Sequence, residues 1–268
     1  MIKEGYKETS TGLTPIEWKV KKLNEITKVY DGTHQTPNYV EEGIPFYSVE
    51  HVTSNNFNTK KFITKDVFDK ENKRVKIEQE DILMTRIGDV GTVKYIDWDV
   101  NASFYVSLAL IKKSANFNSR YISHFFRGSQ FQKELWKRII HTAFPKKINL
   151  GELSNCSVAL PPLPEQQKIA TILSTVDAKL ENITQQIYTT EQLKKGLMQQ
   201  LLSGKFNVLE NRPYTKEELK DSPLGKIPKD WEVVKQAEVA IFFNGRAYKL
   251  KEWEEKGTPV IRLQNLTG

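Results

Sequence analysis

The hydrophobic pattern of the first 160 residues predicts a mixed, β-rich domain. Short runs of β-branched and aromatic residues are bounded by Gly, Asp and Asn, a pattern typical of strands. One segment, Ser119 to Ile140, instead carries its apolar residues on one helical face, and Gly128 can divide it into two helices. The expected strands are Ile44–Val49, Asp81–Thr85, Thr92–Ile96, Phe104–Ile111 and Ser157–Leu160.

A single long helix is expected after this domain. The stiff sequence 161–164, which reads Pro-Pro-Leu-Pro, leads into Glu165, an acid suited to the positive end of a helix dipole. The run from Glu165 to Ser203 contains no Pro, would span roughly 58 Å, and is followed by Gly204 as a helix end. Its apolar residues recur in steps of four and three, the heptad spacing of a coiled coil. This helix stripe comprises Ile169, Leu173, Val176, Leu180, Ile183 and Ile187, and continues less regularly to Leu197 and Leu201.

The last zone of the chain repeats its beginning. The segment Gly12–Val20 aligns with Gly225–Val233 at an offset of 213, and both contain a Pro and a Trp at matching positions. Such agreement indicates an internal duplication, of which the second copy covers only the opening part. The further aligned pairs are Gly32 with Gly245, Gly43 with Gly257, Pro45 with Pro259 and Thr53 with Thr267.

Charge and cysteine content narrow the class of partner. The net charge of +7 suits a polyanion, and nine basic residues but one acid lie between Lys112 and Lys147, although a solvated helix face would also explain that segment. The single cysteine, Cys156, provides no disulfide framework and is expected in the core of a cytoplasmic protein. No apolar run is long enough to span a bilayer, so no membrane partner is expected.

The sequence contains no convincing catalytic or metal-binding pattern. Residues 88–91 (Gly-Asp-Val-Gly) are typical of a hairpin turn rather than a phosphate-binding loop. Asp66 followed by Glu71 and Lys73 fits a nuclease pattern only loosely. Metal-ligand spacing is absent among the four histidines, His34, His51, His124 and His141.

Several motifs together resemble the specificity subunits of type I restriction–modification enzymes. The string PPLPEQQKIATIL at 161–173, followed by a heptad helix that closes in LKKGLMQQLLSGKF at 193–206, resembles the central conserved region of that family. GIPFYSVEHV at 43–52 and DILMTRIGDVGTV at 81–93 are similar to recurrent motifs of its target-recognition domains. The segment 227–231 resembles the entry into a second such domain.

The resemblance implies an α+β fold and a DNA-binding scaffold without catalysis of its own. It implies a target-recognition domain at 1–160, a spacer helix at 161–206 and the start of a second recognition domain at 207–268. Two such domains at opposite ends of two antiparallel helices would read the halves of a bipartite site in double-stranded DNA. Methylation subunits carrying S-adenosylmethionine and restriction subunits using ATP would dock on this scaffold, which itself needs no cofactor. The alternatives are a nucleic-acid enzyme and a structural coiled-coil protein.

DNA contacts are expected on loops that join the strands of the first domain. Lys and Arg side chains there would hold phosphates, and amide or hydroxyl side chains would read bases. Arg86 could instead pair with Asp81 or Asp89 within a turn. The predicted contacts are Thr33, His34, Gln35, Lys60, Lys61, Arg86, Lys146 and Lys147.

The helix stripe predicts self-association. Eight large apolar side chains on one face form a patch of the kind that monomers avoid, and a full subunit of the family would cover it with a second helix. Because that second helix is absent from this sequence, we expect either a truncated product or a half-subunit that forms an antiparallel homodimer. The alternative is a monomer whose helix folds back on its own first domain.

Overall fold

The computed structural model describes residues 4–249, 252–263 and 266 of the chain. These residues form two compact units, 1–183 and 184–268, and the division falls inside the long helix. The helix is therefore not a unit by itself, since its first half belongs to one unit and its second half to the other. No helix among the described residues is both long and apolar enough to cross a membrane.

A four-stranded antiparallel sheet lies at the centre of the first unit. Its strands, in order, are β4 (Val29–Asp31), β10 (Leu108–Ile111), β7 (Ile82–Ile87) and β8 (Asp89–Tyr95), and the central strand β10 is apolar and buried at every position because both faces of the sheet are covered. One face packs on α4 (Ser119–Arg127), α5 (Ser129–Trp136) and neighbouring elements, and the other on a second cluster near α2 (Val49–Thr53). This arrangement builds two cores on one sheet.

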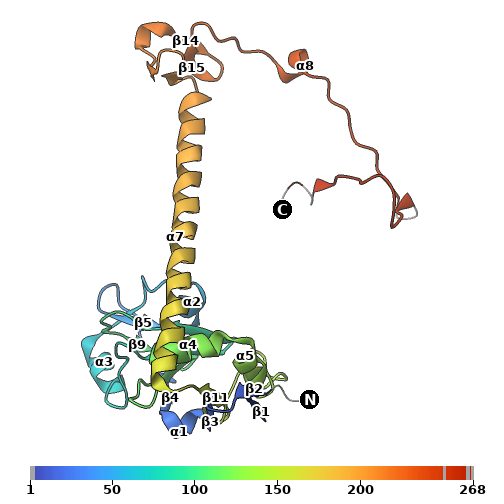
Figure 1. Cartoon of the computed structure of the whole chain (residues 1–268). Helices are drawn as coiled ribbons and strands as arrows, with labels where there is room; N and C mark the ends of the chain where they lie inside the picture. The colour runs from blue at the N-terminus through green and yellow to red at the C-terminus, as the bar shows by residue number, and fades with distance from the viewer. Residues whose placement is uncertain (1–3, 250–251, 264–265, 267–268) are drawn as a thin grey trace. The chain divides into compact units, whose positions relative to one another are not determined.

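The first unit also contains a smaller, three-stranded sheet, of which β5 (Ile44–Tyr47) and β9 (Ser103–Phe104) are labelled in Figure 1. In this sheet β5 pairs with β6 (Phe62–Ile63) and, in parallel, with β9. Two of the predicted strands have different bounds here. The expected strand 44–49 ends early because Ser48 begins helix α2, and the expected strand 104–111 is broken at residues 105–107, where the chain leaves β9 and enters β10.

The other predictions for the first unit are confirmed in part: the expected strands 81–85 and 92–96 occur as β7 and β8 with shifted ends, the helical segment ends at Trp136 and not at Ile140, and three short helices were not predicted. The predicted helix Ser119–Ile140 is divided at Gly128 into α4 and α5, and β11 (Ser157–Leu160) has the predicted bounds. The short elements are β1 (Tyr6–Thr9), β2 (Gly12–Pro15), β3 (Lys19–Lys22), α1 (Leu23–Ile26), α3 (Lys65–Glu71) and α6 (Leu150–Ser154). Strand β3 pairs with β11, and Cys156 is fully buried beside them, as predicted for a core residue.

The long helix α7 (Leu163–Leu201) has 39 residues, as predicted, and is anchored in the first unit by its opening turns. Gln166 is buried: its Oε1 accepts from the backbone N–H of Asn118 at 2.9 Å, and its Nε2 donates to the Pro161 carbonyl at 2.8 Å. A second attachment lies two turns later, where His124 Nε2 is 3.1 Å from Ser174 Oγ and Arg127 pairs with Asp177 at 3.0 Å. The glutamine of the PEQQ motif thus ties the helix to the domain that precedes it.

The predicted duplication is present in the backbone of both units. The hairpin of β1 and β2 reappears as β14 (Leu219–Ser222) and β15 (Gly225–Pro228), with every paired residue shifted by 213. Gly12 and Gly225 occupy equivalent turn positions with φ of +92° and +96°, a region that favours glycine. Helix α1 is likewise repeated at the same offset by α8 (Gln236–Val239).

The second copy leaves apolar surface exposed among its described residues. In the first copy Leu23 and Ile26 are buried, whereas Val239, three residues into α8, is exposed, as are Ile241 and Phe243. The segment 232–235, equivalent to β3, is not paired as a strand in the part of the chain that the structure describes. This unit also contains β12 (Phe206–Asn207), β13 (Arg212–Pro213) and the 3₁₀ turn Lys216–Glu218.

Candidate nucleic-acid interface

The loop after β4 is held tightly against the turn between β9 and β10. The N–H of Thr33 donates to the Phe104 carbonyl at 3.0 Å, and the N–H of Val106 donates to the Thr33 carbonyl at 2.9 Å. Gly32 is required here because a Cβ would lie 2.0 Å from the Phe104 carbonyl oxygen. The loop therefore presents His34 and Gln35 to solvent from a fixed backbone.

Arg86 lies beneath this loop and joins three segments that are distant in sequence. Its Nε donates to the Ile148 carbonyl at 3.2 Å, and its Nη1 donates to the Val106 carbonyl at 2.9 Å. The same guanidinium lies 3.7 Å from the carboxylate of Asp31, the last residue of β4. Only about a tenth of the Arg86 side chain is exposed, so its donors serve the protein interior.

The third segment at this junction is the loop that ends with Lys146 and Lys147. The N–H of Gly88, in the turn between β7 and β8, donates to the Lys146 carbonyl at 2.8 Å, and the N–H of Ile140 donates to the Lys147 carbonyl at 2.8 Å. Their backbone is thereby fixed while both lysine side chains are exposed. The structure thus brings the cationic pair 146–147 and the polar pair 34–35 to segments that meet at Arg86.

The electrostatics of the junction centre on Asp31. Burial opposes ionisation of Asp31, but His34 Nε2 at 2.8 Å and Arg74 Nη1 at 2.9 Å stabilise the carboxylate, and the pKa of Asp31 lies below its ordinary value. Burial also lowers the pKa of Arg86, an effect that the charge of Asp31 opposes. The carboxylate of Asp31 thus lies near two guanidinium groups, those of Arg86 and Arg74.

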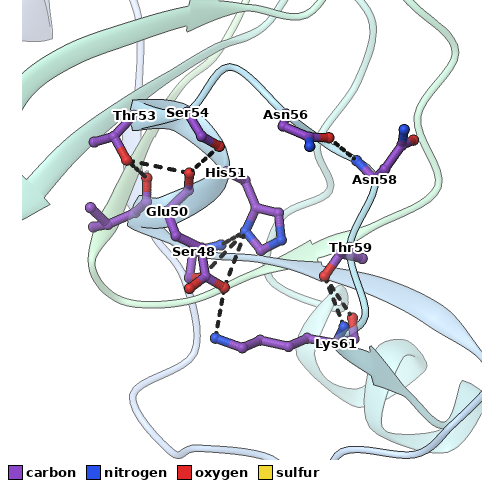
Figure 2. Close-up of polar contacts among 10 residues, drawn as sticks. Ser48, Glu50, His51, Thr53, Ser54, Asn56, Asn58, Thr59 and Lys61 are labelled. Atoms are coloured by element: carbon purple, nitrogen blue, oxygen red, sulfur yellow. Dashed lines mark hydrogen bonds and ion pairs between the residues drawn. The ribbon is translucent and has the colours of Figure 1, made fainter. Parts of the chain in front are cut away.

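Residues between Ser48 and Lys61 form a further set of polar contacts (Figure 2). The His51 Nδ1 accepts from the Ser48 N–H at 2.9 Å, and burial lowers the pKa of this imidazole. Lys61 Nζ lies 2.7 Å from the Glu50 carboxylate and holds the pKa of Glu50 below its usual range. Lys60, by contrast, is exposed. Of this predicted lysine pair, Lys60 is the one whose exposure suits a phosphate contact.

Two of the eight predicted contacts are buried. Arg86 lies within β7 and is buried, and it interacts with Asp31 rather than with Asp81 or Asp89. Thr33 is buried by the turn against which its loop packs, and its hydroxyl donates to the Gln35 carbonyl at 3.3 Å. Both therefore shape the loops from within. The exposed members of the set are His34, Gln35, Lys60, Lys146 and Lys147, and Lys61 is half-buried.

Sequence patterns did not point to three residues that build this surface. Asp31 follows an ordinary strand, and Arg74 lies 43 positions away from it in a polar stretch, so no local signal joins them. Tyr105 interrupts what looked like one strand, and its hydroxyl lies 3.1 Å from Thr36 Oγ1. The polar residue Ser107, close to Tyr105, is the one sequence signal that indicates a break in this strand.

The helix stripe, the second predicted site, is partly exposed along α7. Ile169 packs on the first core, whereas the following stripe residues are between 40% and 57% exposed within their own units. Within the first unit the helix contacts its domain as far as Asp177, and the side chains of Val176, Leu180 and Ile183 remain exposed there. The exposed stripe residues are Leu173, Val176, Leu180, Ile183, Ile187 and Leu197.

An α+β domain with polar and basic loops that continues into a long helix is the architecture of a DNA specificity domain. Residues 15–192 match the family described as the type I restriction modification DNA specificity domain, and the chain belongs to that family. It is 27% identical over 97% of its length to the putative type I restriction enzyme MjaX specificity subunit of Methanocaldococcus jannaschii. It is 28% identical over 98% of its length to the MjaVIII specificity subunit of the same organism.

These relatives are longer than the chain. It covers 62% of the first and 58% of the second, so it spans about three fifths of the length of these relatives. A solved structure titled as the structural basis of complex assembly and conformational transition of the type I R-M system shares the fold, with a TM-score of 0.50 and 17% identity. That match covers 70% of this chain and 45% of the solved chain.

Proposed function

We propose that the chain recognises a DNA sequence for a type I restriction–modification complex and catalyses neither methylation nor cleavage. Family membership supports the class of function. The observation that supports the location is the junction at Arg86, because it holds exposed polar and cationic side chains from distant segments on one rigid support. Rigid presentation matters, since base readout requires hydrogen-bonding groups at fixed positions in a groove.

Different side chains of this surface have different proposed roles. Lys60, Lys146 and Lys147 contact phosphates and determine the register and the salt dependence of binding. Gln35 carries an amide that can pair with an adenine edge, and His34, already bound to Asp31 through one ring nitrogen, has its other nitrogen for a base. Arg86 and Thr33 keep these side chains in place.

The proposed partners follow from the family. Methylation subunits would supply S-adenosylmethionine and restriction subunits would use ATP, while this chain supplies the DNA sequence preference. Because the substrate is the DNA of the cell, we place the chain in the cytoplasm.

Selection from a random pool tests the proposed function. The full chain is incubated with duplexes that carry a randomised 30-base-pair core, and the bound fraction is amplified and sequenced over successive rounds. The expected result is enrichment of a defined sequence and salt-dependent affinity for it. Equal retention of all duplexes, or no binding at low salt, would contradict the proposal. Turnover of DNA by the purified chain would contradict its non-catalytic role.

We also propose that the helix stripe pairs with the stripe of a second copy in an antiparallel arrangement. An antiparallel pair centred on Gln185 places Ile183 opposite Ile187 of the other copy and Leu173 opposite Leu197, so these apolar residues meet across the axis, while Lys194 lies opposite Val176 and not opposite another lysine. A parallel pair in register would place Lys194 opposite its own copy, a repulsive contact. The resulting dimer would carry the same recognition domain at both ends and would prefer an interrupted palindrome.

The energetics make this dimer sensitive to small changes. Six stripe residues are about half exposed in each copy. Burying the surface that these side chains still expose contributes about 1 kcal/mol per residue, or roughly 12 kcal/mol for two copies. Association costs about 4–15 kcal/mol, so the net is small. Leu180→Asp with Ile183→Asp should therefore yield monomers in sedimentation at micromolar concentration. Asn182→Asp with Thr189→Asp, on the opposite helix face, is the matched control and should leave the dimer intact; a monomeric parent chain would refute the pairing.

A further inference from the structure

The segment from Trp136 to Lys147 places exposed aromatic rings among positive charges. Phe144 is 102% exposed and Trp136 is 62% exposed, and these are the two most exposed large apolar side chains among the described residues of the first unit. The same twelve positions contain four Lys or Arg residues and no acid; of these, Arg138 pairs with Glu134 and Glu152, whereas Lys146 and Lys147 next to Phe144 are exposed. A fully exposed ring next to exposed lysines suits a ligand that combines stacked bases with negative charge, as nucleic acid does.

The Phe144 ring is carried by an anchored loop and not by a loose end. The backbone is fixed on one side of it by the hydrogen bonds of Lys146 and Lys147 already described. On the other side Trp136 packs its ring against His141, with 4.5 Å between centroids, and His141 Nε2 lies 2.9 Å from the Trp136 carbonyl oxygen. Trp136 thus has a ring contact within the loop, with His141, whereas the Phe144 side chain is fully exposed.

We propose that Phe144 inserts between adjacent base pairs of bound DNA while Lys146 and Lys147 contact the neighbouring phosphates. This inference rests on the proposed function. Apolar side chains such as Phe act as wedges that unstack one base step, and cations on the flanking backbone offset the phosphate charge that the insertion brings close. A protein partner would be expected to provide acids opposite these lysines, which is the competing outcome of the test.

The test uses duplexes selected by the full chain, with 2-aminopurine substituted at successive positions. Binding of the parent chain should increase the fluorescence at one position, where a base is unstacked. Phe144→Ala should abolish this increase and weaken binding by roughly 5- to 150-fold, the range found for the loss of one base–aromatic stack. Phe144→Leu, which can still insert, should retain part of both effects. Since the ring is exposed, neither change should alter the melting temperature.

Two controls separate the possible failures. Ile16→Ala removes an exposed apolar side chain (58% exposed) beside Glu17, outside this loop, and should leave affinity and fluorescence unchanged. The inference is overturned if Phe144→Ala binds as tightly as the parent, or binds more weakly with the fluorescence pattern intact. It is also overturned if the variant binds DNA normally but no longer joins the methylation subunits, since the ring then contacts protein. Failure of the parent chain to select any duplex would instead overturn the proposed function itself.

Discussion

Replacing Arg86 by methionine tests whether the recognition loops depend on a buried support. The substitution keeps most of the side-chain volume but removes the donors to the carbonyls of Ile148 and Val106 and the charge opposite Asp31. Ile148 is fully buried, so its carbonyl would be left without that donor, at a cost of about 1–3 kcal/mol. Water can replace the donor at the half-buried Val106, and Asp31 keeps His34 and Arg74.

The expected net loss is about 2 kcal/mol in the free energy of unfolding. In a domain of this size that corresponds to a melting temperature lower by roughly 4–8 °C, measured by circular dichroism. Arg86→Lys should recover little of this loss, because a single ammonium cannot donate to both carbonyls and face Asp31 in the same geometry. Arg74→Met is the matched control: it removes the half-exposed partner of Asp31 and should shift the melting temperature less.

DNA binding gives the second measurement on the same variants. Arg86→Met should weaken specific binding while leaving the slope of log affinity against log salt unchanged, because no phosphate contact is lost. A melting temperature within a degree of that of the parent would refute the supporting role. A slope reduced by about one would show that Arg86 contacts a phosphate directly, as the sequence alone suggested.

Three further predictions concern charge and reactivity. Lys146→Ala with Lys147→Ala should weaken binding to all duplexes and reduce the salt slope by about one to two, and an unchanged slope would exclude this loop from the backbone contact. The pKa of Asp31 is lowered in the folded state, so its contribution to the free energy of unfolding should be present above pH 4 and decline as the pH falls below the ordinary value of 3.8. Denaturant titrations of Asp31→Asn should therefore lack this part of the loss of stability in acid. Burial raises the pKa of the Cys156 thiol to about 12, so Ellman's reagent at pH 8 should not react with the folded chain but should titrate one thiol in urea; rapid reaction of the folded chain would contradict its core position.

The sequence alone determined the features that depend on local pattern. The heptad spacing fixed a helix of 39 residues, displaced by only two positions from the predicted bounds. The aligned Gly, Pro and Trp residues were sufficient to identify a repeat at an offset of 213, and the structure shows that the repeated segment begins with a hairpin in the same register. Helical periodicity and turn conformation are properties of neighbouring residues, so they can be recognised without a tertiary structure.

The tertiary structure decided which side chains face solvent at the recognition loops. An arginine next to a Gly-Asp turn has the same sequence signal whether it contacts phosphate or supports a loop, and only the positions of Asp31, Val106 and Ile148 bury Arg86. Likewise, the glutamine at 166 appeared as part of a motif, but its role in joining helix to domain depends on the N–H of Asn118, 48 residues away. Such contacts satisfy buried polar groups across long sequence separations, and no local pattern specifies them.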